Sequence, residues 1–107
     1  MADKKLVRIE QEIEEIKREL MGIGDMRPGS LTRQYRNVEE KKWGFYQLSY
    51  THKMKSRTNY VRAHQVAELR EQIQTYRKFK RLVEKWIDLA IESSKIKMDI
   101  VNRSLTK

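Results

Sequence analysis

Amide and basic side chains alternate with aromatic ones in the middle of the chain. If this segment forms a β-hairpin, alternation sends Tyr46, Leu48 and Tyr50 to one face, and we expect Thr58 and Tyr60 to join them. The opposite face then carries Phe45, Gln47, Ser49, Arg57 and Asn59. Arg pairs bidentately with guanine, and Asn or Gln with adenine, in a major groove that admits a two-stranded ribbon. This face is therefore a candidate for reading nucleic-acid bases, although an ordinary solvated sheet face is equally polar.

Two further groups of cations suit phosphates. Lys53 and Lys55 lie at the expected hairpin tip, beside His52. The second group lies in the helical segment after residue 63, where four cations share one face at helical spacing and Lys78 lies close to them: Arg70, Arg77, Arg81 and Lys85. Phosphate contacts would add salt-dependent affinity without sequence selectivity. The alternative is that these residues only keep a helix face and a hairpin tip solvated.

The net charge supports an anionic partner. The 107 residues include 24 Lys and Arg against 15 Asp and Glu, a formal net charge of +9. Residues 1–21 carry a net charge of −1, residues 22–62 carry +6 and residues 63–107 carry +4. The positive charge is therefore concentrated from the middle of the chain onward, where a nucleic acid is the expected partner.

Catalytic chemistry has few candidates. Cysteine is absent, which excludes disulfides, thiolate nucleophiles and Cys-ligated zinc. His52 has no evident orienting group, and His64 beside Glu68 fits a helix-start contact better than an acid–base pair. Two acidic pairs would hold a metal only if the fold joined them: Glu39 with Glu40, and Asp88 with Glu92. We expect no enzyme activity, no cofactor and no small-molecule substrate.

The aromatic residues offer a stacking alternative. Phe45 is the ring expected to face outward, and Trp43 lies at the entrance of the same strand. Either ring could stack on an exposed base, whereas core packing is the commoner role of aromatic rings in a small domain. Trp86, at helical spacing with Leu82 and Leu89, is expected to pack against another helix.

Periodicity supplies the elements that position these residues. Apolar residues recur at spacings of three and four near the N-terminus, at Leu6, Ile9, Ile13, Ile16 and Leu20. This pattern predicts a helix over 2–21 with a coiled-coil seam. A connector at 22–29 holds two glycines before the only proline and a third after it.

The rest of the chain changes character twice. Tyrosines, hydroxyl residues and basic residues predict three antiparallel strands over 30–62, at 30–36, 44–50 and 55–61. Helical spacing then continues over 63–104 with no Gly or Pro. The expected fold is a single α+β domain with an N-terminal helix, a small three-stranded sheet and a long C-terminal helix.

The long helix needs a partner. At 1.5 Å per residue, about 40 residues would extend roughly 60 Å, beyond what the sheet and the first helix cover. Its apolar far half includes Trp86, Ile87, Leu89, Ile91, Ile96, Ile100 and Val101. We expect it to pair with the N-terminal helix, with a second copy of the chain, or with both. A homodimer follows as a prediction.

Location is inferred from what the sequence lacks. No apolar run approaches the roughly 20 residues of a membrane span, and the first ten residues lack the apolar core of a signal peptide. We therefore expect a cytoplasmic protein without membrane contact.

The middle of the chain holds four recognisable motifs: Pro28-Gly29-Ser30-Leu31 with Gln34-Tyr35, Tyr46-Gln47-Leu48-Ser49-Tyr50, Lys55-Ser56-Arg57-Thr58 with Tyr60-Val61, and the Glu/Gln/Tyr/Arg-rich helix that follows. Together they resemble a family of short uncharacterised prokaryotic proteins associated with transposases and mobile elements. The resemblance covers about two thirds of the chain. Many members carry closely spaced cysteines after the first strand, suggestive of a metal knuckle. Residues 36–42 have none here, so that feature is not carried over.

A weaker likeness is to the three-stranded DNA-binding modules at the N-termini of phage-type integrases, which place their sheet in a DNA groove. With the charge pattern, it implies a nucleic-acid-binding protein, most often of DNA, serving a phage or mobile element as an accessory or regulatory factor in a prokaryotic cell. The alternative is a helical protein-interaction module, such as an anti-defence inhibitor or a transposase partner, that binds a larger protein or nucleoprotein complex.

Overall fold

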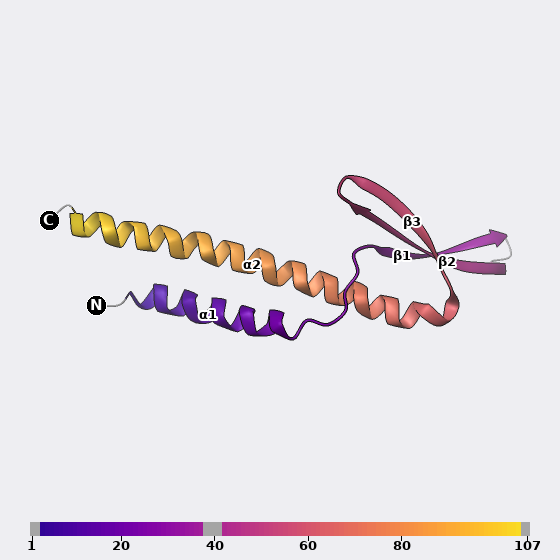
Figure 1. Ribbon diagram of the computed structural model, residues 1–107, viewed down its shortest axis with the longest axis horizontal. Coiled ribbons are helices and arrows are strands. Elements are labelled where there is room, and N and C mark those ends of the chain that lie inside the picture. Colours follow the sequence, from indigo (N-terminus) through magenta and orange to yellow (C-terminus); the bar gives the residue numbers. More distant parts are fainter. Residues whose placement is uncertain (1–2, 38–41, 106–107) are drawn as a thin grey trace. The chain divides into compact units, whose positions relative to one another are not determined.

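The computed structural model describes residues 3–37 and 42–105, apart from the side chains of 35–37 and 42–43. The elements in chain order are α1 (Lys4–Met21), β1 (Ser30–Asn37), β2 (Lys42–His52), β3 (Lys55–Val61), a 3-10 turn (Ala63–Gln65) and α2 (Val66–Leu105) (Figure 1). This confirms the predicted α+β fold and the boundaries of its elements to within a few residues. The chain forms two compact units, a helical hairpin (Met1–Ile23 with Phe79–Lys107) and a sheet unit (Gly24–Lys78).

The sheet is an antiparallel meander in the order β1-β2-β3. Leu48, in the middle of β2, lies opposite Leu31 on β1 and Asn59 on β3. Because side chains alternate between the faces of a strand, these three residues share one face of the sheet. That register decides which surface every other residue of the sheet reaches.

The first turns of α2 cover this face of the sheet. Val66, Leu69 and Ile73 recur at helical spacing and are buried together with Leu48 and Val61. Leu48 is completely buried, and three half-buried side chains pack around the cluster: Leu31, Tyr46 and Tyr50. The spacing of apolar residues in α2 thus matches the apolar alternation in β2, which gives this small unit its core.

Gly29, just before β1, passes very close to β2. Its φ of +137° is a conformation that residues with a side chain rarely adopt. A Cβ at this position would lie 2.7 Å from Leu48 Cδ1 and 2.9 Å from the carbonyl oxygen of Ser49. The connector can therefore lie against the buried centre of β2 only because residue 29 has no side chain.

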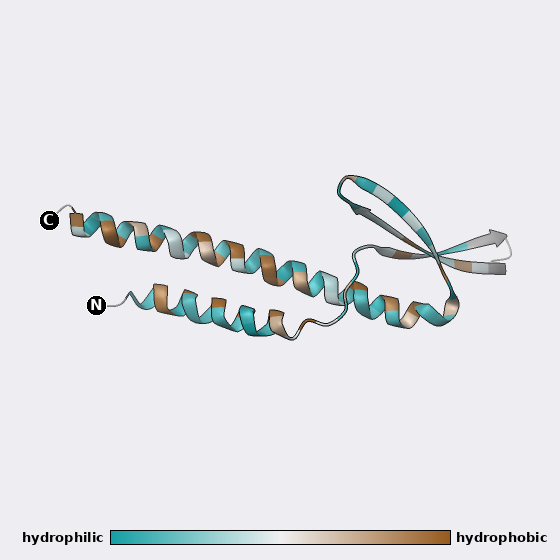
Figure 2. Cartoon of the chain, viewed as in Figure 1, coloured by the Kyte–Doolittle hydropathy of each residue, from teal (hydrophilic) through white to brown (hydrophobic). Residues whose placement is uncertain are grey.

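In the helical hairpin, α1 packs on the far half of α2. Asp3 caps α1, its carboxylate accepting hydrogen bonds from the backbone nitrogens of Lys5 at 2.8 Å and Leu6 at 3.1 Å. Of the predicted seam, Ile9 and Ile16 are buried and Ile13 between them is half-buried. Figure 2 shows that apolar residues recur along α1 on the side that faces α2.

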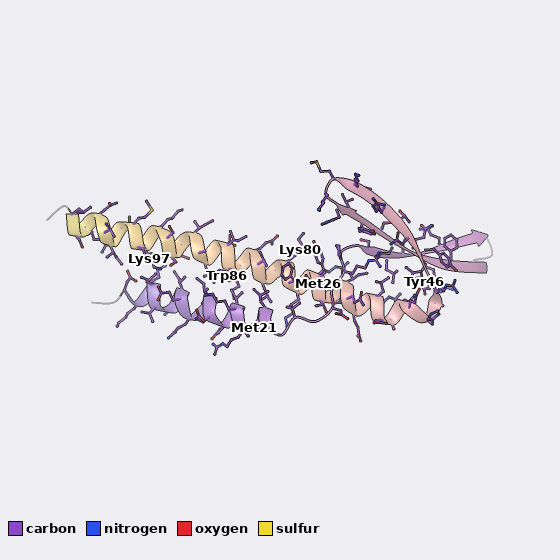
Figure 3. All side chains as sticks on the ribbon, in the orientation of Figure 1. Met21, Met26, Tyr46, Lys80, Trp86 and Lys97 are labelled. Atoms are coloured by element: carbon purple, nitrogen blue, oxygen red, sulfur yellow. The ribbon has the colours of Figure 1, made fainter. Side chains whose placement is uncertain are left out.

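Polar contacts complete the packing of this hairpin. Lys5 Nζ lies 2.9 Å from Glu92 Oε1, and Lys97 Nζ lies 3.6 Å from Glu10 Oε1. The hydrogen bond to Glu92 raises the pKa of Lys5. The ammonium of Lys17 lies 5.5 Å from the centre of the Trp86 ring, on the side of α2 that faces α1 (Figure 3). Trp86 therefore packs against the first helix, as its spacing predicted.

We predict that Gly29→Ala destabilises the protein by about 2 kcal/mol, because a methyl group must displace Leu48 or the β2 backbone and the residue keeps a strained φ. Thermal or urea unfolding followed by circular dichroism measures this loss. Gly24→Ala is the matched control, since a Cβ there meets no atom within 4 Å. Equal stability of the two variants would contradict the tight contact described here.

Candidate nucleic-acid interface

The β2–β3 hairpin extends beyond the rest of the sheet. The first residue of β1, Ser30, pairs with Ser49, so β2 has no β1 neighbour from residue 50 onward. The ladder with β3 continues through Tyr50 and Arg57 to His52 and Lys55. Residues 50–57 therefore form a two-stranded ribbon, which we call the ribbon (Figure 1).

Lys53 and Met54 form the two-residue turn at the end of the ribbon. Both have positive φ angles, 51° and 64°. Two-residue hairpin turns of type I′ require this conformation and normally use Asn-Gly or Asp-Gly. A lysine and a methionine here are unfavourable for the turn itself. They place a cation and an apolar side chain, Met54 at 98% exposure, at the tip of the ribbon.

The ribbon also carries the cations predicted for the hairpin tip. Lys53, Lys55 and Arg57 are all exposed. Arg57 borders a shallow groove of about 460 Å³ between the ribbon and the connector. The groove is lined by residues of β2 and β3, by residues 28–30 and by Tyr76. An exposed guanidinium near two lysines is a suitable donor to the oxygens of a phosphate.

The register corrects one prediction about this hairpin. Gln47 pairs with Tyr60 and Ser49 with Thr58, whereas Leu48 pairs with Asn59 and Tyr50 with Arg57. Thr58 and Tyr60 therefore do not face the core, and Arg57 and Asn59 do not share a face with Gln47. Because the turn has an even number of residues, even-numbered residues of β2 pair with odd-numbered residues of β3. Val61 therefore takes the core position that was predicted for Tyr60.

Asn59 has a structural partner on the core side. In the amide orientation that satisfies both groups, its side-chain oxygen accepts a 2.7 Å hydrogen bond from Arg27 Nη2. The guanidinium of Arg27 also lies 5.3 Å from the centre of the Tyr50 ring, and its backbone nitrogen donates to the carbonyl of Gln72 at 3.1 Å. Asn59 and Arg27 thus link β3, the connector and α2. This structural role explains Asn59 better than the predicted contact with a nucleic-acid base.

The other face of the sheet carries uncharged side chains, among those that the structure describes. Hydroxyl groups pair across the strands, Ser49 with Thr58 at 3.4 Å and Thr51 with Ser56 at 2.9 Å. Phe45 and Tyr60 pack ring to ring with 6.1 Å between centroids, and Tyr60 is 67% exposed. Phe45 is therefore on the face that was predicted, half-buried beside Tyr60, and Gln47 is half-buried on the same face.

The predicted cations of α2 are all exposed. Arg70, Arg77 and Lys78 belong to the sheet unit, and Arg81 and Lys85 belong to the helical hairpin. The guanidinium of Arg70 lies 5.9 Å from the centre of the Tyr46 ring, and that of Arg33 lies 5.7 Å from the same centre. Arg70 therefore stacks beside the core while keeping its charge at the surface.

Two features of the candidate site were not predicted from the sequence. Arg27 was assigned to the connector with no role, and Thr51 and Ser56 were not singled out. Cross-strand hydroxyl pairs in the ribbon follow from an even-length turn, so this signal was present in the sequence. Trp43 as a stacking ring and Glu39 with Glu40 as a metal pair lie outside the described side chains.

The described residues hold no group of three or more His, Asp or Glu side chains placed to bind a metal ion. No helix in the described part of the chain is long and apolar enough to cross a membrane. Comparisons of the chain with protein-family models, with curated proteins and with solved structures find no match.

We predict that Met54→Gly stabilises the protein by about 1 kcal/mol, because glycine adopts a positive φ without the steric cost that Met54 bears. Met54→Ala is the matched control: it removes the same exposed side chain but keeps the strained conformation. Urea unfolding should therefore rank Met54→Gly above both Met54→Ala and the unmodified protein. If the two variants are equally stable, the turn does not hold residue 54 in the left-handed conformation.

Proposed function

We propose that the protein binds double-stranded DNA through the ribbon. The observation that carries the proposal is the two-stranded extension beyond β1, with Lys53, Lys55 and Arg57 exposed at and near its tip. A two-stranded ribbon fits the major groove of B-form DNA, which is about 12 Å wide. Lysine and arginine along such a ribbon reach the phosphates on either side of the groove.

The distribution of charge supports an anionic partner for the sheet unit in particular. Residues 24–78 contain twelve Lys and Arg against five Asp and Glu, whereas the helical hairpin is close to balance, with twelve against ten. A unit with this excess attracts a polyanion and accelerates its association. Solubility alone does not require the excess to be confined to one unit.

Phosphate contacts are the main source of affinity in this proposal. Since Gln47 lies on the opposite face from Arg57 and Asn59, these three side chains do not form one base-reading surface. Lys53, Lys55 and Arg57 would hold phosphates. Gln47 remains the candidate for a base contact on the outer face, together with the exposed ring of Tyr60.

DNA is favoured over double-stranded RNA on geometric grounds. The major groove of A-form RNA is deep and too narrow for side chains to read, so a protein ribbon does not enter it as it enters B-form DNA. The resemblance to proteins associated with mobile elements supports an accessory or regulatory role in handling the DNA of such an element. That role is part of the proposal.

We predict that DNA affinities measured over a range of salt concentrations distinguish binding by the ribbon from attraction by the net charge of the protein. Replacing Lys53, Lys55 and Arg57 together by Gln should lower the affinity for a 20-base-pair duplex and reduce the slope of log K against log salt by about 2 to 3, because each phosphate contact contributes about 0.9 to that slope. Fluorescence anisotropy over a range of salt concentrations measures both quantities. A duplex RNA of the same sequence should bind more weakly than the DNA.

The matched control removes the same number of positive charges from the helical hairpin, by replacing Lys4, Arg8 and Arg18 with Gln. This variant should retain the slope of the unmodified protein to within about 1. Equal losses in the two triple variants would mean that net charge, not the ribbon, drives binding. Absence of DNA binding by the unmodified protein at low salt would refute the proposed function.

A second candidate function is protein association through the helical hairpin. It is favoured by apolar side chains that α1 leaves uncovered on the far half of α2, including Ile87 at 52% exposure and Met98 at 63%. A protein-interaction role does not compete for the ribbon, because these residues lie in the other unit.

A further inference from the structure

The far half of α2 carries two apolar stripes, each at spacings of three and four residues. The first stripe packs on α1; its members are buried or half-buried: Phe79, Leu82, Trp86, Leu89, Ser93 and Ile96. The second stripe is formed by Ile87, Ile91, Ser94, Met98, Val101 and Leu105. Its spacings are four, three, four, three and four residues, the pattern of positions a and d in a coiled coil.

The second stripe is exposed along its whole length. Its large side chains show exposures of 50% at Ile91, 55% at Val101 and 78% at Leu105. Figure 2 shows apolar residues recurring along this half of α2. Scattered apolar residues are common on protein surfaces, but a continuous heptad stripe over almost twenty residues marks an interaction site.

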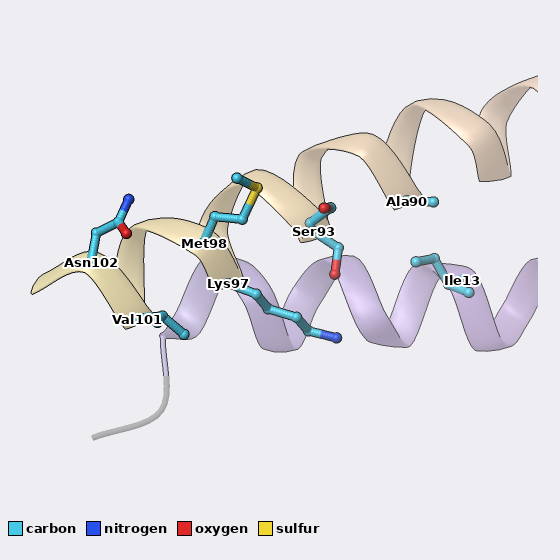
Figure 4. A pocket seen from close by; sticks show the side chains of 8 residues that line it. Ile13, Ala90, Ser93, Lys97, Met98, Val101 and Asn102 are labelled. Carbon is cyan, nitrogen blue, oxygen red and sulfur yellow. The ribbon is translucent and has the colours of Figure 1, made fainter. Parts of the chain in front are cut away.

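A groove runs beside the second stripe, between α2 and α1. Its lining includes Ser94, Met98 and Val101 from the stripe, together with Ile13 from α1 (Figure 4). Its volume is about 630 Å³. Side chains from another helix could enter this groove while that helix lies along the stripe, as knobs enter holes in a helical bundle.

The charges that flank the stripe indicate which helix this is. Asp88 follows Ile87 and Lys95 follows Ser94, so both residues occupy position e of the heptad. They lie on the opposite flank of the stripe from Lys97. Both are exposed. On the other flank, Lys97 Nζ lies 3.6 Å from Oε1 of Glu10 on α1. An open flank with opposite charges seven residues apart is complementary to its own copy when the two helices run antiparallel.

We propose that the second stripe, from Ile87 to Met98, binds the same segment of a second copy of the chain, forming an antiparallel homodimer in which the two α2 helices lie along each other. In this arrangement Asp88 of one copy faces Lys95 of the other, and the two-fold axis repeats the pair. A parallel pairing would instead set Asp88 against Val83 and Lys95 against Ala90 at position g of the other copy, and neither of these residues is charged.

Light scattering after gel filtration tests the dimer. The unmodified protein should have about twice the chain mass of 13.0 kDa at micromolar concentration. Met98→Lys should shift the protein to the monomer, because it places a charge in the middle of the apolar stripe. Gln74→Lys, an exposed substitution of the same charge change on the same helix, should leave the dimer intact.

A charge exchange tests the orientation and the identity of the partner. Asp88→Lys and Lys95→Asp should each weaken the dimer about tenfold, because each places like charges opposite one another at both symmetry-related pairs. The double variant should recover the original dissociation constant to within about threefold. Far-UV circular dichroism checks that each variant keeps its helix content.

Each result bears on the proposal. A 13.0 kDa particle for the unmodified protein at micromolar concentration would refute the dimer and leave the stripe for a different protein. A dimer in which the double variant remains as weak as the single variants would refute the antiparallel arrangement. Neither result depends on DNA binding, so the dimer and the proposed function can fail separately.

Discussion

The alternation of side chains along β2 determines which surface each residue of the sheet unit reaches. Leu48 is completely buried, and its position fixes the faces of both neighbouring strands through the ladder. A shift of β2 by one residue would exchange its faces and place Gln47 or Ser49 in the core. The burial of one leucine thus holds Arg57 and Asn59 on one face and Gln47 on the other, and limits which residues can act together on a ligand.

Periodicity along α2 has a corresponding role for the helices. Its first turns bury Val66, Leu69 and Ile73 against the sheet, whereas its far half presents one stripe to α1 and leaves a second exposed. A helix with an apolar stripe on one side needs one neighbour, and a helix with two stripes needs two. The chain supplies one of these neighbours as α1. The second stripe is the structural basis for proposing association with another copy.

The fold was predictable from the sequence because its signals are local. Heptad spacing from Leu6 to Leu20, the glycines of the connector and the absence of Gly or Pro after Gly44 define the elements. The faces of β3 were not predicted, because Tyr60 is more apolar than Asn59 and was therefore assigned to the core. The even-length turn sets these faces locally, whereas the hydrogen bond from Arg27 that holds Asn59 on the core side joins residues distant in the sequence. The cations of the candidate site were found from the sequence because exposed positive charge needs no such partner.

The division of the chain into units has a consequence for the order of folding. The sheet unit is one continuous segment, whereas the helical hairpin joins the two ends of the chain. Closing the hairpin first would confine all of residues 24–78 in an unstructured loop, at a cost in chain entropy that a folded sheet unit largely removes. We therefore expect the sheet unit to gain protection from hydrogen exchange before α1 does during refolding.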